Sequence, residues 1–221
     1  MARAIREGIG HDGRTLFPIM PYEQYKDMTD EDVASVVVYL RSLPAVHNPL
    51  PRRKLPFMLS RMINTVPQPV DHEIKVGSND PVSRGKYLAT VAHCGACHTP
   101  TDDHGMPLPG LDFAGGADFG PDFGVVSANI TPDATGIGYY DEALFIRTMR
   151  TGSVGARPLH VPMPWWNFRN MTDEDLKDVF AFLRTVKPVH HAVDNTEVAT
   201  YCKRCKVKHG FGERNETLAV K

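Results

Sequence analysis

The sequence predicts a mostly α-helical protein that contains two related modules, and three observations lead to this prediction. One segment near the start of the chain recurs much later without a gap. Each copy places apolar residues at helical spacing behind a capping threonine. Glycine and proline number 18 each among 221 residues, which is above average and predicts long irregular loops between the helices.

The repeated segment covers residues 14–47 and 157–190, at a constant offset of 143, and 14 of its 34 positions are identical. In each copy a threonine, Thr29 or Thr172, precedes the run Asp-Glu-Asp. Such residues favour a helix start because their oxygens interact well with the free N–H groups of the first turn. Apolar side chains then follow at positions i, i+3, i+4 and i+7. These are Val33, Val36, Val37 and Leu40 in the first copy and Leu176, Val179, Phe180 and Leu183 in the second.

The chain divides into four segments on this interpretation. They are a partial module (1–47), a proline-rich linker (48–80), a complete module (81–190) and a polar, basic tail (191–221). Helices are expected over residues 83–92 and 141–151 of the complete module, and a short one near 58–63 of the linker. The stretch ARAIREG at residues 2–8 resembles the end of the 141–151 helix. The first segment therefore reads as the C-terminal half of a module whose N-terminal half is absent.

The stretch AHCGACH, at residues 92–98, carries the chemistry of the complete module. Cys94 and Cys97 are three positions apart and His98 follows at once, which is the C-x-x-C-H pattern of covalent haem attachment. Two thiols at this spacing add across the two vinyl groups of one porphyrin, and the histidine then reaches the iron from the same turn. The motif predicts one covalent haem c with His98 as proximal ligand. A zinc site or a thioredoxin-like pair is the alternative, although no strands flank the motif as the latter requires.

Met163 is the predicted second axial ligand, because haem iron in electron carriers commonly takes a methionine there. It lies between Pro162 and Pro164, which stiffen the backbone and prevent a regular helix. A methionine on such a rigid loop suits ligation better than core filling. His160 is the rival ligand, and ligation by two histidines would lower the reduction potential.

The other methionines downstream of the motif have simpler explanations. Met106 follows His98 by only eight residues, too few to reach the opposite face of a haem comfortably. Met149 falls in an expected helix, where core packing accounts for it. Met171 precedes the last helix as the apolar partner in a hydrophobic staple.

These features together resemble a class I cytochrome c. The resemblance is carried by RGKYLA at residues 84–89, CGACH at 94–98, PMPW at 162–165 and the final amphipathic helix. It implies a cytochrome c-type helical domain wrapped round one haem, with its first and last helices crossing. It also implies that Gly85 allows the close approach of an aromatic side chain such as Phe180.

The loop SANITPDATGIG, at residues 127–138, points to a narrower group of proteins than the general cytochrome c motifs do. It is similar to the multi-module cytochrome c subunits of membrane-bound alcohol, aldehyde and sugar-acid dehydrogenases. Those subunits carry tandem modules joined by proline-containing linkers. This chain departs from that pattern because it has a single C-x-x-C-H. Met20 corresponds to Met163 in the repeat, yet no haem motif precedes it, so no haem is expected in the partial module.

A second cysteine pair lies in the tail. Cys202 and Cys205 are followed by Lys206 rather than histidine, so this pair is not expected to hold haem. A disulfide, a redox-active pair and a metal site that includes His209 are the alternatives.

The predicted function is electron transfer. A haem with histidine and methionine ligands has no open coordination position, so it moves single electrons and is not expected to act as an enzyme. The resemblance implies a dehydrogenase as donor and a quinone or oxidase as acceptor. A haem peroxidase-like enzyme with an open distal site near His160 is one alternative, and a haem-free zinc or disulfide protein is another.

Charge and hydropathy limit the partners and the location. The formal net charge of −1 gives no basis for nucleic-acid binding. The longest apolar run near the start, residues 33–40, is far shorter than the roughly 20 residues of a membrane span. No span is expected, and peripheral membrane association is left open.

By resemblance, haem attachment belongs in the periplasm. Residues 1–20 lack the apolar stretch of a leader, so an incomplete N-terminus is expected.

Overall fold

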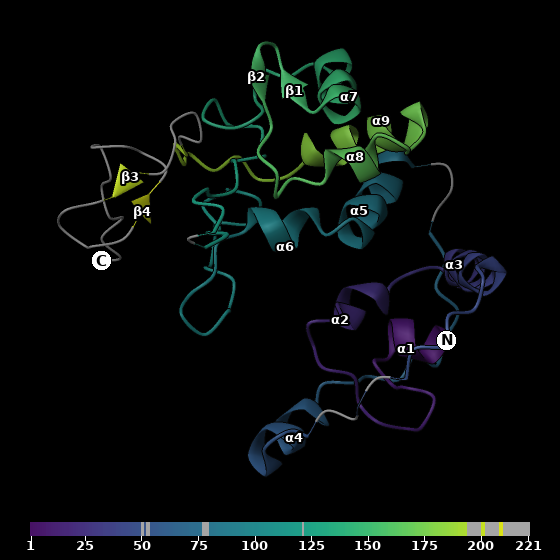
Figure 1. The fold of residues 1–221 in the computed structure, drawn as a ribbon. Coiled ribbons are helices and arrows are strands. Elements are labelled where there is room, and N and C mark those ends of the chain that lie inside the picture. Colours follow the sequence, from purple (N-terminus) through teal and green to yellow (C-terminus); the bar gives the residue numbers. More distant parts are fainter. Residues whose placement is uncertain are drawn as a thin grey trace. The chain divides into compact units, whose positions relative to one another are not determined.

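Short helices supply most of the regular structure in the computed structural model (Figure 1). The structure describes residues 1–49, 51, 54–76, 80–120, 122–193, 200–201 and 208–209. Two units are distinguished, Met1–Gly77 and Ser78–Lys221. The mostly α-helical fold class is confirmed.

The helices fall where the sequence patterns place them, with several short additions. The first unit contains α1 (Ala2–Arg6), α2 (Tyr22–Tyr25), α3 (Asp30–Ser42) and α4 (Phe57–Ile63). The second contains α5 (Pro81–Val91), α6 (Cys94–His98), α7 (Glu142–Thr151), α8 (Trp165–Phe168) and α9 (Asp173–Leu183). Strand β1 (Ser153–Val154) pairs antiparallel with β2 (Arg157–Pro158), and β3 (Thr200–Tyr201) pairs antiparallel with β4 (Lys208–His209).

Side-chain caps explain where the longer helices begin. The Thr29 hydroxyl accepts the Asp32 N–H at 3.1 Å and so starts α3. The Thr172 hydroxyl accepts the Asp175 N–H at 3.1 Å, and the Asp175 carboxylate accepts the Thr172 N–H at 3.0 Å, which completes a capping box at α9. The predicted caps of both repeat copies are confirmed.

Helix α5 packs against α9, and Gly85 allows the two backbones to approach closely (Figure 1). A Cβ atom at position 85 would lie 1.8 Å from the Asp178 carbonyl oxygen and 3.0 Å from the Phe182 Cβ. The expected contact with Phe180 is wrong. Phe180 faces the core instead and stacks on Phe145 of α7, with 5.2 Å between the ring centroids.

The core of the second unit forms where α5 and α7 pack against α9. Its buried members are Ala89, Ile137, Phe145, Met149, Leu176, Val179, Phe180 and Leu183. Burial of large apolar side chains contributes roughly 1.5–3 kcal/mol each relative to their exposure, so this cluster is the main stabilising feature of the unit.

Two glycines show that the repeat continues into α1, at an offset of 144 rather than 143, so the two copies differ by one residue between α1 and residue 14. Gly8 and Gly152 follow α1 and α7, and both have positive φ, 68° and 69°. A Cβ atom at Gly8 would lie 2.6 Å from the Tyr22 ring, and one at Gly152 would lie 2.2 Å from the Trp165 ring. Both positions therefore need glycine for two reasons, the backbone conformation and the aromatic ring.

Two arginines repeat in the same way. The Arg6 guanidinium pairs with Asp30 at 2.5 Å, and the Arg150 guanidinium pairs with Asp173 at 2.6 Å. Each arginine also donates to a backbone carbonyl, Arg6 to Lys26 and Arg150 to Arg169. The two copies share these contacts, while the interpretation of residues 1–47 as half a module stays a prediction.

The apolar stripe expected on α3 is largely exposed. Val33 is 3% exposed, but Val36 and Leu40 are 37% and 42% exposed, whereas Val179 and Leu183 at the equivalent positions of α9 are 4% and 2% exposed. The physical reason is the neighbour: α5 covers α9, while α3 packs against α1 within the described part of the first unit.

Two further features concern the membrane and the tail. Among the described residues, none of the helices combines the length and apolar character needed to cross a bilayer. Cys202 and Cys205 lie outside the described residues. The alternatives for that pair stay predictions.

Candidate haem site

A cavity of about 350 Å³ lies within the second unit, and its volume is in the range of small-molecule sites. Its walls come from α6, α7, α9, the loop of residues 125–140 and the segment before α8. Most of the lining is aliphatic or aromatic. Typical members are Ile130, Ile137, Phe145, Leu159, Phe168, Val179 and Leu183. Such walls suit a cofactor that is largely apolar.

Cys94, Cys97 and His98 line this cavity from α6. His93, with φ at 63°, turns the chain from α5 into this short helix. Both cysteines are free thiols. Burial, reinforced by the nearby Cys97, raises the pKa of Cys94 to about 12, and burial also raises the pKa of Cys97. A thioredoxin-like pair needs a lowered thiol pKa, and burial in this apolar site acts in the opposite direction on both cysteines.

The Ala128 carbonyl orients the His98 ring. His98 Nδ1 lies 2.7 Å from this oxygen. Because a carbonyl can only accept, Nδ1 carries the proton and Nε2 keeps its lone pair. Histidines that bind metals commonly use this arrangement. Burial lowers the pKa of His98 while the hydrogen bond to Ala128 opposes that shift, and the net result favours the neutral ring.

Met163 lines the same cavity from the loop between β2 and α8. Its N–H donates to the His160 carbonyl at 3.0 Å, and its carbonyl accepts the Trp165 N–H at 2.9 Å. These local turns, together with Pro162 and Pro164, fix the backbone on both sides of the thioether.

The other methionines and His160 differ in whether they line the cavity. Met149 also lines the cavity, from α7, but it is 8% exposed and belongs to the core cluster. Met106 is 62% exposed, and neither it nor Met171 is part of the cavity lining. His160 does line the cavity, so both sixth-ligand candidates named from the sequence, Met163 and His160, lie there.

The loop that carries Met163 is held by contacts between α7, α8 and α9. The Trp165 ring of α8 lies against Gly152 at the end of α7. Arg150 of α7 donates to the Arg169 carbonyl just after α8 and pairs with Asp173 at the start of α9. These contacts fix α8 and therefore the residue two positions before it.

The donor set at the cavity fits a covalently attached haem. Two thiols at the required spacing, an imidazole nitrogen with a free lone pair and a thioether all border one apolar space. A zinc site fits less well, because the described residues contain no group of three or more His, Cys, Asp or Glu side chains that could hold a metal ion.

Comparison with known proteins supports the same conclusion. Residues 82–187 match the family model for cytochrome c, and this match includes α5 to α9 and the whole C-x-x-C-H motif. Residues 82–187 are a cytochrome c domain. The resemblance proposed from the sequence is confirmed.

Curated proteins similar to this chain are cytochrome subunits of dehydrogenases. The chain is 32% identical over 205 residues to the alcohol dehydrogenase (quinone) cytochrome c subunit of Gluconacetobacter polyoxogenes, covering 84% of this chain and 43% of that protein. It is 32% identical over 202 residues to the fructose dehydrogenase cytochrome subunit of Gluconobacter japonicus, covering 84% and 40%. It is 36% identical over 121 residues to the gluconate 2-dehydrogenase cytochrome c subunit of Pantoea cypripedii, covering 53% and 26%. The chain thus spans less than half the length of these relatives.

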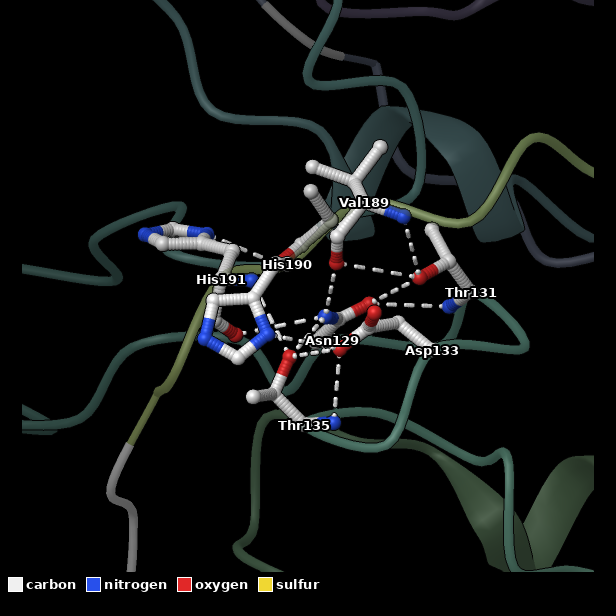
Figure 2. Close-up of polar contacts among 8 residues, drawn as sticks. Asn129, Thr131, Asp133, Thr135, Val189, His190 and His191 are labelled. Atoms are coloured by element: carbon white, nitrogen blue, oxygen red, sulfur yellow. Dashed lines mark hydrogen bonds and ion pairs between the residues drawn. The ribbon is translucent and has the colours of Figure 1, made fainter.

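Sequence reasoning missed a polar network in the cytochrome c domain (Figure 2). Asn129, Thr131, Asp133 and Thr135 interact with one another and with the segment Val189–His191 that follows α9. A local signal was present, because side chains of these types recur at every second position and favour turns in which they bond to nearby backbone. Their partners some 60 residues later left no signal in the sequence.

Proposed function

We propose that this chain is a c-type cytochrome that carries single electrons through one haem attached to Cys94 and Cys97. His98 and Met163 are the side chains that would hold its iron. The observation that carries the proposal is that all four side chains border one apolar cavity, although Met163 lies 65 residues beyond His98 in the sequence.

Each residue has a defined role in this proposal. Cys94 and Cys97 would hold the haem covalently through their thiols. His98 ligates through Nε2, and the Ala128 carbonyl keeps the ring in the tautomer that permits it. Met163 would hold the iron through its thioether, and an iron held by both side chains would carry electrons without binding a substrate. The bound haem supplies one-electron chemistry.

The proposed partners follow from the relatives. A dehydrogenase subunit is the proposed donor, because the relatives are cytochrome subunits of alcohol, fructose and gluconate dehydrogenases. A quinone or a terminal oxidase is the proposed acceptor. The proposed location is the periplasm or the periplasmic side of a membrane, with peripheral association.

Spectroscopy of protein made with the haem-attachment machinery tests the proposal. The pyridine haemochrome assay should give one covalent haem per chain, and the oxidised protein should be low-spin with a methionine-to-iron charge-transfer band. Met163→Ala should abolish that band and keep the covalent haem. Met149→Leu is the matched control, since it conserves volume at a second methionine of the same cavity.

Three outcomes would contradict the proposal. Absence of covalent haem would favour a zinc or disulfide protein. A high-spin, peroxide-reactive iron would favour an enzyme with an open site near His160. Loss of the charge-transfer band in Met149→Leu, with the band kept in Met163→Ala, would assign the ligand to α7.

A further inference from the structure

A polar clamp joins the loop of residues 127–138 to the segment after α9 (Figure 2). The clamp comprises the side chains of Asn129, Thr131 and Thr135 and the backbone of Val189 and His191. Asn129 Nδ2 lies 2.9 Å from the Val189 carbonyl oxygen and 3.2 Å from the His191 carbonyl oxygen. In the other direction, the Val189 N–H donates to Thr131 at 3.2 Å and the His191 N–H donates to Thr135 at 3.0 Å.

Asn129 is the centre of the clamp. Its Oδ1 accepts the Thr131 N–H at 2.9 Å and the Thr131 hydroxyl at 2.8 Å, while its Nδ2 also lies 3.1 Å from Thr135 Oγ1. Asn129 is 4% exposed and Thr131 is 0% exposed. Buried polar groups of this kind are destabilising when a partner is removed, so the clamp holds the loop in one conformation.

The clamp is adjacent to the carbonyl that orients His98. Asn129 directly follows Ala128, whose carbonyl oxygen lies 2.7 Å from His98 Nδ1. On the other side of Ala128, the Ser127 N–H donates to the Ala117 carbonyl at 2.9 Å. A Cβ atom at Gly115 would lie 2.3 Å from the Ala128 carbonyl carbon, so the backbone there is also tightly packed.

We propose that Asn129 is a positioning residue, which through the clamp aims the Ala128 carbonyl at His98 and so sets the reduction potential. This inference rests on the proposed function. A hydrogen bond donated by Nδ1 makes the imidazole a stronger electron donor to the iron and stabilises the oxidised state. When the clamp is broken, the carbonyl loses its fixed position, the bond weakens and the potential rises.

Thr131→Val is the sharpest test. It changes no charge, keeps nearly the same side-chain shape and removes only the hydroxyl, from a buried residue that does not line the cavity. Both Thr131→Val and Asn129→Ala should raise the midpoint potential of the holoprotein, Asn129→Ala by more. In the reduced protein, solvent exchange of the His98 Nδ1 proton, followed by NMR, should become faster in the same order.

Two control variants accompany the test. Thr131→Ser keeps the hydroxyl and should restore the potential and the slow proton exchange. His190→Gln changes a side chain of the same segment that is 80% exposed and pairs with Asp133. Asp133 also accepts hydrogen bonds from the N–H and the hydroxyl of Thr135, and this variant keeps both of those bonds. Its potential should match that of the wild type.

The outcomes separate this inference from the proposed function. If wild-type protein holds no covalent haem, the proposed function fails and this inference fails with it. If the haem and the methionine-to-iron band are present but Thr131→Val and Asn129→Ala leave the potential and proton exchange unchanged, only the positioning role of Asn129 is overturned. A rise in potential of the same size in His190→Gln would also overturn it.

Discussion

Asp175 is the residue at which helix capping and helix packing meet. Its carboxylate accepts the Thr172 N–H at the start of α9 and also pairs with Arg84 of α5. Burial acts to raise the pKa of Asp175, but the hydrogen bonds with Thr172 and the Arg84 guanidinium outweigh burial and lower it. The hydrogen bond with Asp178 is the largest factor that raises the pKa of Arg84. The ion pairs of Arg84 with Asp175 and Asp178 therefore connect α5, the first helix of the domain, to α9, the last.

Asp175→Asn is expected to reduce the free energy of unfolding by about 1–2 kcal/mol at neutral pH, because one charge-assisted bond to Arg84 is lost. The folded-state pKa of Asp175 is lowered, so its contribution is fully present above its unfolded pKa of about 3.9 and is lost as the pH falls through the folded value. Urea unfolding at several pH values should show a constant difference between wild type and variant above about pH 5 that closes below about pH 4.

Glu174→Gln is the matched control for this experiment, since it removes an exposed carboxylate from the same helical turn. Its effect should stay within about 0.5 kcal/mol at every pH. A difference for Asp175→Asn that does not change with pH would show that the charge of Asp175 is unimportant.

The sequence allowed part of this residue-level chemistry to be predicted. The threonine caps were predictable, because their hydrogen bonds join residues three positions apart. Gly85 was correctly predicted to allow the close approach of an aromatic residue. The aromatic residue beside it is Phe182, while Phe180, two positions earlier, stacks on Phe145. The sequence did not show which of the two side chains of α9 faces α5. The contact of Arg84 with α9 spans about 90 residues and had no local signal.

At the scale of elements, the junction of α7 and α8 controls the loop that carries Met163. Gly152→Ala would bring a Cβ atom to 2.2 Å from the Trp165 ring and must displace α8. The variant is therefore expected to lose most of the methionine-to-iron charge-transfer band while it keeps its covalent haem. Optical spectra of the oxidised protein would measure this.

Gly155→Ala provides the control for that variant. Gly155 also has a positive φ, 58°, but a Cβ atom there would meet nothing within 4 Å. Both variants carry backbone strain of roughly 1–2 kcal/mol, and only Gly152→Ala also displaces a ring. Equal loss of the band in both would show that strain in the hairpin, rather than the position of Trp165, controls the ligand loop.

The comparison of α3 with α9 shows why element-level prediction is incomplete. Both helices have the predicted caps and the same apolar stripe. Yet Leu183 is 2% exposed and the equivalent Leu40 is 42% exposed. A stripe of apolar residues indicates that one face of a helix is suited to burial. Whether another helix covers that face depends on the rest of the chain.

At the scale of the whole molecule, haem attachment should stabilise one unit selectively. All residues that line the cavity belong to the unit Ser78–Lys221. A covalent haem would stay attached when the chain unfolds, but its apolar contacts with the cavity and its bonds with the proposed ligands His98 and Met163 would exist only in the folded unit, and they would stabilise that unit. The double variant Cys94→Ser/Cys97→Ser should therefore show faster amide hydrogen exchange in α5 and α9 and unchanged exchange in α3. Equal acceleration in all three helices would contradict this expectation.

The apolar walls of the cavity have a consequence for the speed of electron transfer. Water and mobile dipoles must rotate whenever a nearby charge changes, and this rearrangement sets much of the activation barrier. The cavity walls are mostly hydrocarbon, and the loop of residues 127–138 that forms part of them is held in place by the clamp around Asn129. Groups that are already fixed need little reorganisation when charge moves. A site built in this way should exchange electrons with a small reorganisation energy, so that rates depend chiefly on the distance and the driving force between partners.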